Sequence, residues 1–368
     1  MRSIRVQTRS ANYPVFVQPR LLGKLANRIQ LACGEQRSIF VVTSAPIWDL
    51  WQKRFLASLQ QKKIAVHVLF IPPGERQKRM STVERLAEEL SGAGAKRDAL
   101  LLAFGGGVVG DMTGFLAAIY MRGVRYIQVP TTYLAQIDSS VGGKTGVNLR
   151  AGKNLLGSFH HPAAVFCDPA VLSTLPAREL RAGLVESVKA AVLGDARYFA
   201  WLERHLDKLL AGEEKSLTQA IESSVRIKAE IVGADELESG QRMLLNLGHT
   251  VGHAIEAATG YSALLHGEAI AWGMMAALSL AVERSRLRAA QARRIEHLLF
   301  RLGPFPRFRT SAKGLLERTA ADKKHLQTVR RFVLPVAIGQ AVIVEDVSDQ
   351  ELLAAIQSML RLVKERGV

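Results

Sequence analysis

Residues 99–111, with the sequence ALLLAFGGGVVGD, join an apolar run to a glycine-rich turn. The run ALLLAF is apolar throughout, which is typical of a strand covered on both faces in a parallel sheet. Residues 112–121, MTGFLAAIYM, continue with a helical pattern. Because a glycine turn lets the backbone approach a pyrophosphate and a helix N-terminus supplies N–H donors, the stretch predicts a βα unit with a candidate dinucleotide site. An ordinary tight βα turn is the alternative.

Further apolar, β-rich runs alternate with helical segments on both sides of this stretch. They are SIFVVTS at 38–44, IAVHVLFI at 64–71, YIQVPTT at 126–132 and AAVFCDP at 163–169. This alternation predicts a Rossmann-like parallel sheet with helices on both faces. Two earlier runs, at 4–8 and 13–17, flank a short turn and predict a hairpin at one sheet edge.

The pattern changes near Pro169 and Pro176 to long segments with a helical period. The clearest of these segments are 201–210, 217–232 and 294–302. We therefore expect an α/β domain of residues 1–175 and a mainly α-helical domain of residues 176–368. The apolar run 330–346 is expected to add a small β element to the second domain.

The composition bounds the class of protein and its partners. The chain has 368 residues, of which 48% are hydrophobic, so it can build a sizeable core. Its 49 Lys and Arg against 33 Asp and Glu leave a net charge of +16, which suits nucleic acid, an anionic membrane or a small anionic substrate. The basic residues are scattered through amphipathic segments such as 284–302, without a nucleic-acid motif. We therefore expect no nucleic acid, while the charge alone does not choose between a membrane and a small anionic substrate.

The sequence also indicates a compartment. The N-terminal residues 1–17 contain no continuous apolar stretch typical of a secretory signal. The apolar segment 269–282 is shorter than the ~20 residues a spanning helix needs, so it predicts a buried helix. Cys33 and Cys167 are too few for a disulfide framework, which indicates a reducing compartment. A cytoplasmic location is expected.

Residues 138–162, DSSVGGKTGVNLRAGKNLLGSFHHP, form a second glycine-rich stretch. Its low apolar content predicts a position outside the core. Lys144 and Lys153 among glycines favour a cradle for phosphate or carboxylate, with a solvated loop as the alternative. A Walker A motif is excluded because Asp138 stands where its first glycine is required.

Histidines cluster in the second half of the chain. GHTVGHAIE at 248–256 places His249 and His253 four residues apart on one helix face, and His266 follows in HGEA. Three nitrogen or carboxylate ligands with an open position describe a catalytic zinc site, for which Glu186 is a candidate acidic member. A metalloprotease is excluded because Thr250 replaces the glutamate of H-E-x-x-H. The alternative for each histidine is a satisfied buried side chain.

Other ionisable residues are weaker candidates when taken singly. Lys189 is three residues from Glu186, a spacing that usually marks a surface pair. The residues before the histidines are Lys228, Glu238, Arg242 and Asn246, and the segment ADKKH at 321–325 adds Lys323 and Lys324. An exposed charge run is the alternative for the last segment.

Taken together, these blocks resemble the 3-dehydroquinate synthase family. The resemblance rests on GGGVVGD, MRGVRYIQVPTTYLAQIDSSVGGKTGVN, GKNLLGSFHHP, ESVKAAV, NLGHTVGHAIE, HGEAIAWGM and DKK, in the family's order over residues 105–324. It implies a lyase of the shikimate, or chorismate, pathway of aromatic amino acid biosynthesis. Such an enzyme converts 3-deoxy-D-arabino-heptulosonate 7-phosphate to 3-dehydroquinate and phosphate by transient NAD-dependent oxidation, phosphate elimination, reduction and aldol closure. The implied cofactors are NAD and Zn2+, with Co2+ as a substitute. The implied partner is a small anionic sugar phosphate, with no nucleic acid and no membrane.

The resemblance also implies roles for individual residues. The metal ligands would be Glu186, His249 and His266, with His253 as a proton-transfer residue. The other catalytic or substrate-contacting residues would be Asp138, Lys144, Asn154, Lys189, Lys228, Glu238, Arg242, Asn246 and Lys324. The cofactor-binding residues would be Glu75, Lys78, Gly106, Gly107, Val108, Asp111, Thr131, Thr132, Lys144, Lys153 and Thr174. Arg122 resembles an arginine that enters the neighbouring subunit's site, which implies a homodimer.

One departure from the family pattern and three alternatives accompany this interpretation. Ser44, Ala45 and Pro46 occupy the place where the family often has an aspartate for the adenosine ribose. A different sugar phosphate cyclase or a metal- and NAD-dependent polyol dehydrogenase could share the fold. The set of anion-binding residues disfavours a polyol dehydrogenase, and the scattered basic residues disfavour a nucleic-acid binder.

Overall fold

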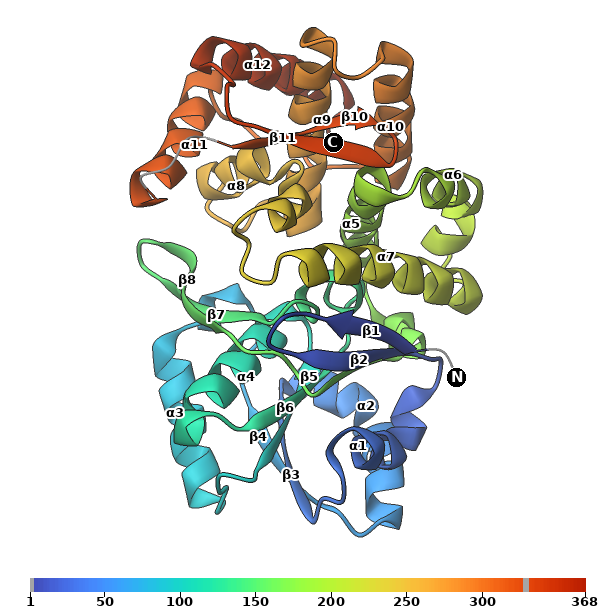
Figure 1. Cartoon of the computed structure of the whole chain (residues 1–368), viewed down its shortest axis with the longest axis vertical. Helices are drawn as coiled ribbons and strands as arrows, with labels where there is room; N and C mark the ends of the chain where they lie inside the picture. The colour runs from blue at the N-terminus through green and yellow to red at the C-terminus, as the bar shows by residue number, and fades with distance from the viewer. Residues whose placement is uncertain (1–2, 327–330) are drawn as a thin grey trace. The chain divides into compact units, whose positions relative to one another are not determined.

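The computed structural model describes residues 3–326 and 331–368, and only the backbone of residues 320–326 (Figure 1). The chain divides into two compact units. The first comprises Met1–Leu175 with Gly212–Leu237, and the second comprises Pro176–Ala211 with Glu238–Val368. One boundary coincides with the predicted division at 175/176, whereas residues 212–237 group with the first unit. The division into functional domains 1–175 and 176–368 stays a prediction.

The first unit is built on a seven-stranded sheet whose strand order is β1-β2-β9-β6-β5-β3-β4. Every neighbouring pair is parallel except β1 and β2, which form the predicted edge hairpin. The strands are β1 Ser3–Gln7, β2 Asn12–Val17, β3 Ser38–Thr43, β4 Ala65–Phe70, β5 Leu100–Gly105, β6 Arg125–Pro130 and β9 Ala164–Cys167. All residues of β5 are buried, as its continuous apolarity predicts.

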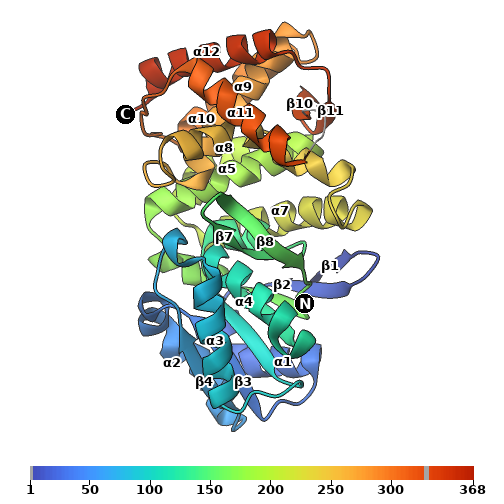
Figure 2. The ribbon, with the colours of Figure 1, turned by 90° about the vertical axis from the view of Figure 1, so that its left-hand side faces the viewer.

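Helices connect the parallel strands and cover the sheet. They are α1 Leu25–Cys33, α2 Ala45–Gln61, α3 Met80–Gly92 and α4 Gly107–Ile119, with short helices η1 Leu21–Lys24, η2 Glu75–Gln77, η3 Tyr120–Arg122, η4 Ala135–Ser139 and η5 Pro169–Thr174. Figure 2 shows α3 beside α4, and the two helices are in contact. Val83, Leu86 and Leu90 of α3 share one helix face and are fully buried in the core.

The second glycine-rich stretch is an antiparallel hairpin of β7 Lys144–Leu149 and β8 Gly152–Phe159. The expectation that this stretch lies outside the core is wrong for β7, because Val147 is fully buried in the core cluster. Glycine explains the close packing: a Cβ at Gly114 of α4 would lie 2.4 Å from the Thr145 methyl group. In contrast, β8 is largely exposed.

Helix α7, Glu214–Ala234, belongs to the first unit because it packs on β1 (Figure 1). The contact is close enough that a Cβ at Gly233 would lie 2.7 Å from the Gln7 carbonyl oxygen. The helical period at 217–232 predicts the helix, but it does not indicate against which unit the helix packs.

The second unit is mainly helical, as predicted. Its helices are α5 Ala177–Gly194, α6 Ala196–Leu210, α8 His249–Ala258, α9 His266–Glu283, α10 Ala289–Leu302, α11 Ala312–Leu326 and α12 Asp349–Arg366, with the short helix η6 Gln241–Asn246. The late apolar run forms the predicted β element, a hairpin of β10 Phe332–Ala337 and β11 Gln340–Val344. Residues 269–282 lie in α9, which is mostly buried. Among the described residues, none of the helices has the length and apolarity required to cross a bilayer.

Helix α9 crosses the start of α8 at a glycine. A Cβ at Gly273 would lie 2.0 Å from the Gly248 carbonyl oxygen and 2.8 Å from the Gly252 nitrogen. Since both atoms are backbone, Gly273→Ala must push the two helices apart, at a cost of about 3 kcal/mol. We expect the thermal midpoint to fall by about 6–12 °C.

Gly92→Ala is the matched control, because a Cβ at this helical glycine has no heavy atom within 4 Å. Thermal unfolding followed by circular dichroism compares the two variants. Equal midpoints would contradict the close α8–α9 contact.

Candidate functional site

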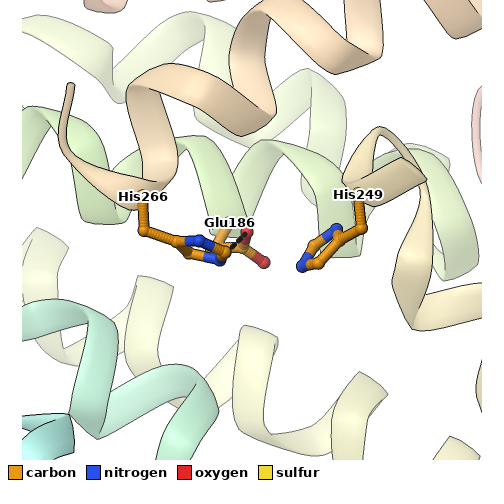
Figure 3. A group of neighbouring side chains, drawn as sticks. All are labelled: Glu186, His249 and His266. Atoms are coloured by element: carbon orange, nitrogen blue, oxygen red, sulfur yellow. Dashed lines mark ion pairs between the residues drawn. The ribbon is translucent and has the colours of Figure 1, made fainter. Parts of the chain in front are cut away.

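The candidate metal centre lies in the second unit, where Glu186, His249 and His266 come together (Figure 3). One potential ligand atom from each residue lies within 4.8 Å of the others. Glu186 is on α5, whereas His249 and His266 are the first residues of α8 and α9. The start of α9 approaches α5 closely, since a Cβ at Gly267 would lie 1.8 Å from the Ala182 carbonyl oxygen.

The donor atoms of this centre suit a metal ion. Glu186 is buried, its Oε2 pairs with Lys189, and its Oε1 has no hydrogen-bond partner within the described part of the chain. Oε1 lies 3.8 Å from Nε2 of His266. Nδ1 of His249 lies 3.2 Å from the Leu247 carbonyl oxygen and can donate to it, which leaves Nε2 as a ligand. Two imidazoles and one carboxylate are a common ligand set of catalytic zinc.

The protonation of the two histidines differs. Burial, together with Lys189, lowers the pKa of His249 well below its usual value, so this ring is neutral as a metal ligand must be. Burial alone would lower the pKa of His266, but the carboxylates of Glu256 and Glu186 outweigh it and raise the pKa. Without a metal, these two carboxylates therefore favour the protonated ring.

A second group of possible metal ligands shares His266. His253, Glu256 and His266 also bring one potential ligand atom each within 4.8 Å of one another. His253 lies next to the centre, with its ring centroid 5.2 Å from that of His249, but it is exposed. Helix spacing alone pairs His249 with His253, whereas the ligand set implied by the family resemblance pairs His249 with His266.

Three further predicted residues, Glu238, Arg242 and Asn246, lie in or just before η6. Asn246 donates from Nδ2 to Oε1 of Glu238 at 3.1 Å. Arg242 is buried in η6, with 1% of the residue exposed. The side chain of Lys324 lies outside the described residues.

The candidate dinucleotide site lies in the first unit, at the carboxyl ends of β5 and β6. Helix α4 begins at Gly107, with Gly106 as its N-cap. A Cβ at Gly106 would lie 3.0 Å from the Thr132 methyl group, and one at Gly107 would lie 3.0 Å from Oγ of Ser139. The nitrogen of Thr131 donates to the Gly105 carbonyl at 3.0 Å and joins the two strand ends. Ligands of open α/β sheets bind at such strand ends, so the site fits a pyrophosphate.

A polar network lies beside this turn. Lys78 is buried and donates from Nζ to Asp111 and to Oδ1 of Asn154. Burial raises the pKa of Asp111, although the charge of Lys78 opposes the shift. Asn148, which the sequence pattern does not single out, donates from Nδ2 to Glu75 at 2.8 Å and accepts from the Asn154 nitrogen at 2.9 Å. An asparagine in a glycine-rich strand carries no signal that distinguishes it from a turn residue.

The remaining predicted residues of the first unit are spread more widely. Nζ of Lys228 on α7 donates to the carboxylate of Asp138 and, at 2.7 Å, to its carbonyl oxygen. Lys144 is exposed at the start of β7. Thr174 accepts a hydrogen bond from the Trp51 ring nitrogen at 3.2 Å. The other members of the set are Lys153 on β8, Val108 on α4 and Arg122 in η3.

The junction between β3 and α2 holds Ser44, Ala45 and Pro46, at the place where the family often has a ribose-binding aspartate. Ser44 is the N-cap of α2, and the first turn of the helix contains a proline and no acidic residue. A ribose-binding carboxylate is therefore absent from this helix start.

Comparison with known proteins identifies the family. Residues 68–182 match the family described as 3-dehydroquinate synthase N-terminal, and residues 183–325 match 3-dehydroquinate synthase C-terminal. The 3-dehydroquinate synthase of Koribacter versatilis (strain Ellin345) is 43% identical over 359 residues, which are 98% of each chain. The chain belongs to the 3-dehydroquinate synthase family. A second 3-dehydroquinate synthase, from Nitrosococcus oceani, is 44% identical over 96% of this chain and 98% of the relative.

Solved structures agree with this membership. A 2-epi-5-epi-valiolone synthase from Streptomyces hygroscopicus subsp. jinggangensis, with NAD+ and Zn2+ bound, has a TM-score of 0.87 and 32% identity over 95% of this chain and 97% of that chain. A 2-deoxy-scyllo-inosose synthase complexed with carbaglucose-6-phosphate, NAD+ and Co2+ has a TM-score of 0.86 and 26% identity over 97% and 99%. An iron-containing alcohol dehydrogenase, at 15% identity and a TM-score of 0.71, shares the fold alone. Three predictions are confirmed: membership of the 3-dehydroquinate synthase family, the fold class, and the class of enzyme.

Proposed function

We propose that the chain converts 3-deoxy-D-arabino-heptulosonate 7-phosphate to 3-dehydroquinate and phosphate, by the reaction sequence that the family resemblance implies. The observation that carries this proposal is the 43% identity to a 3-dehydroquinate synthase over 98% of both chains. The test is incubation with the heptulosonate 7-phosphate, catalytic NAD and zinc, with phosphate and dehydroquinate as readouts. Release of phosphate without dehydroquinate would contradict the proposal.

Zinc is the proposed metal, with cobalt as a substitute, and Glu186, His249 and His266 are its proposed ligands. The ion supplies a Lewis acid that favours ionisation of a substrate hydroxyl. Lys189 balances the second oxygen of Glu186, so the carboxylate keeps one oxygen for the ion. His253 is exposed beside the ligands and is proposed to move a proton to or from the substrate.

NAD is the proposed second cofactor, and it supplies a reversible hydride acceptor. The N-terminal amides of α4 are proposed to hold its pyrophosphate, because the helix begins at Gly107, directly after the glycine turn that follows β5. The Lys78 network holds Asp111 and Asn154 beside this turn. The other proposed cofactor-binding residues are Glu75, Val108, Thr131, Thr132, Lys144, Lys153 and Thr174.

The substrate carries a carboxylate and a phosphate, for which the chain offers several cationic and amide groups. Proposed contacts are Asp138, Lys144, Asn154, Lys189, Lys228, Glu238, Arg242, Asn246 and Lys324. A second candidate function, cyclisation of another sugar phosphate, is favoured by the 32% identity to a 2-epi-5-epi-valiolone synthase. Product analysis with a panel of sugar phosphates distinguishes the two functions. The absence of nucleic-acid and membrane partners and the cytoplasmic location stay predictions.

Lys228→Ala is expected to lower kcat/KM at least about tenfold. A charge-assisted hydrogen bond contributes about 1.5–3 kcal/mol, and about 1.4 kcal/mol is a factor of ten. Steady-state kinetics and NAD titration measure the effect, and the affinity for NAD is expected to change little. Lys215→Ala on the same helix is the matched control, because Lys215 is exposed. An equal loss of NAD affinity would place Lys228 at the cofactor instead.

A homodimer is proposed in which Arg122 contacts the substrate of the neighbouring subunit. Arg122 is exposed, and it has a left-handed backbone conformation with φ of 65°. Arg122→Ala and His253→Ala are each expected to be nearly inactive. A mixed dimer should regain one working site, because one chain supplies the intact Arg122 and the other supplies the intact His253.

Activity assays before and after subunit exchange test this assignment, and each variant mixed with itself is the control. Exchange without recovered activity would contradict a role for Arg122 in trans. A fully active monomer would contradict the dimer itself.

A further inference from the structure

His266 lies between two carboxylates. Its Nε2 is 3.8 Å from Oε1 of Glu186, and its Nδ1 is 3.5 Å from Oε2 of Glu256. Glu186 is among the proposed metal ligands, whereas Glu256 belongs to the second group of possible ligands.

Glu256 is placed firmly by the end of α8. Glu256 is 4% exposed. Burying a carboxylate costs several kcal/mol unless it is paired with a cation or a hydrogen-bond donor. The Tyr261 nitrogen donates to the backbone carbonyl of Glu256 at 2.8 Å and closes the turn that follows α8. A carboxylate that is kept buried at this position needs hydrogen-bond donors, and Nδ1 of His266 faces it.

We propose that Glu256 is a positioning residue for the metal centre, and this inference rests on the proposed metal site. Glu256 accepts a hydrogen bond from Nδ1 of His266 and so turns Nε2 toward Glu186 and the ion. The Leu247 carbonyl, 3.2 Å from Nδ1 of His249, does the same for the other histidine. Such partners fix the orientation of a ligand ring and make its free nitrogen more basic, and their loss costs about 10–100-fold in metal affinity.

A competing arrangement has Glu256 as a ligand itself, together with His253 and His266. Two observations favour the positioning role. His253 is exposed, whereas Glu186 is buried with an oxygen that lacks a hydrogen-bond partner in the described chain. A metal ion bound beside Glu186 gives that oxygen a partner. A metal ion bound beside His253 leaves that oxygen without a hydrogen bond or a metal contact.

Zinc affinity, measured by competition with a chromophoric chelator on the full chain, tests the proposal. Glu256→Gln keeps the size of the side chain, and we expect it to bind one zinc about 10–100-fold more weakly than the wild type. Its Co2+ absorption spectrum should keep the intensity of the wild-type site. His253→Ala should retain wild-type affinity, and Glu186→Gln should lose stoichiometric metal. Glu317→Gln, at an exposed position of α11, is the control for the substitution itself.

Each outcome supports or overturns a defined statement. Wild-type zinc affinity in Glu256→Gln overturns the positioning role while the metal site stands, provided that Glu186→Gln loses zinc. Loss of stoichiometric zinc in both Glu256→Gln and His253→Ala, with zinc kept in Glu186→Gln, assigns Glu256 as a ligand and overturns the inference. A wild-type chain without stoichiometric zinc overturns the metal site and the inference together. Thermal midpoints of the metal-free variants separate these results from misfolding.

Discussion

His249→Ala is expected to lose bound zinc and to lower kcat/KM by at least about a thousandfold. His249 begins α8, and its ligand atom lies within 4.8 Å of those of Glu186 and His266. Removing one of three protein ligands leaves too few donors to hold the ion. A Lewis acid supplies several kcal/mol of transition-state stabilisation, and about 4 kcal/mol corresponds to a thousandfold change in rate.

Metal analysis of the purified variants and phosphate release measure this effect. His297→Ala is the matched control, since His297 is an exposed histidine on α10 of the same unit. Chelation of the wild-type protein should abolish turnover, and added zinc or cobalt should restore it. Full zinc occupancy together with normal turnover in His249→Ala would remove this residue from the ligand set.

Most of the fold follows from local sequence patterns. Continuous apolarity in 99–104 predicts a strand that is buried on both faces, and β5 is buried along its whole length. Val147 shows the limit of such reasoning. It stands between Gly146 and Asn148, so no apolar run marks it as buried, and its burial depends on the close packing of α4 on β7 that Gly114 permits. The same limit applies to α7, whose amphipathic pattern shows one apolar face but not its partner.

Local sequence patterns predict less of the candidate site than of the fold. Helix spacing brings His249 and His253 together, because residues four apart share a helix face. The approach of His266 to Glu186 depends on the packing of α9 on α5 through Gly267, which no spacing rule contains. Asn148 and Glu256 act through other side chains, so the sequence alone gives them no distinguishing pattern. The family resemblance implies one ligand set where helix spacing leaves the choice open.

NAD is expected to be required for turnover but not consumed. The atoms of the heptulosonate 7-phosphate equal those of 3-dehydroquinate plus phosphoric acid, so the overall reaction involves no net oxidation. Any hydride that leaves the substrate must therefore return to it before product release. A polyol dehydrogenase, in contrast, forms one NADH for each alcohol that it oxidises.

Removal of NAD should reduce phosphate release to background, and NAD well below the substrate concentration should support complete conversion. Absorbance of NADH and release of phosphate, followed in the same sample, distinguish the two kinds of enzyme. We expect many phosphates for each NAD present and at most a trace of NADH, bounded by the enzyme concentration. Glycerol with excess NAD is the control, and it should yield neither signal. Because a redox-neutral cyclisation cannot accumulate reduced cofactor, stoichiometric NADH from a polyol without phosphate release would place the chain among the dehydrogenases that share its fold.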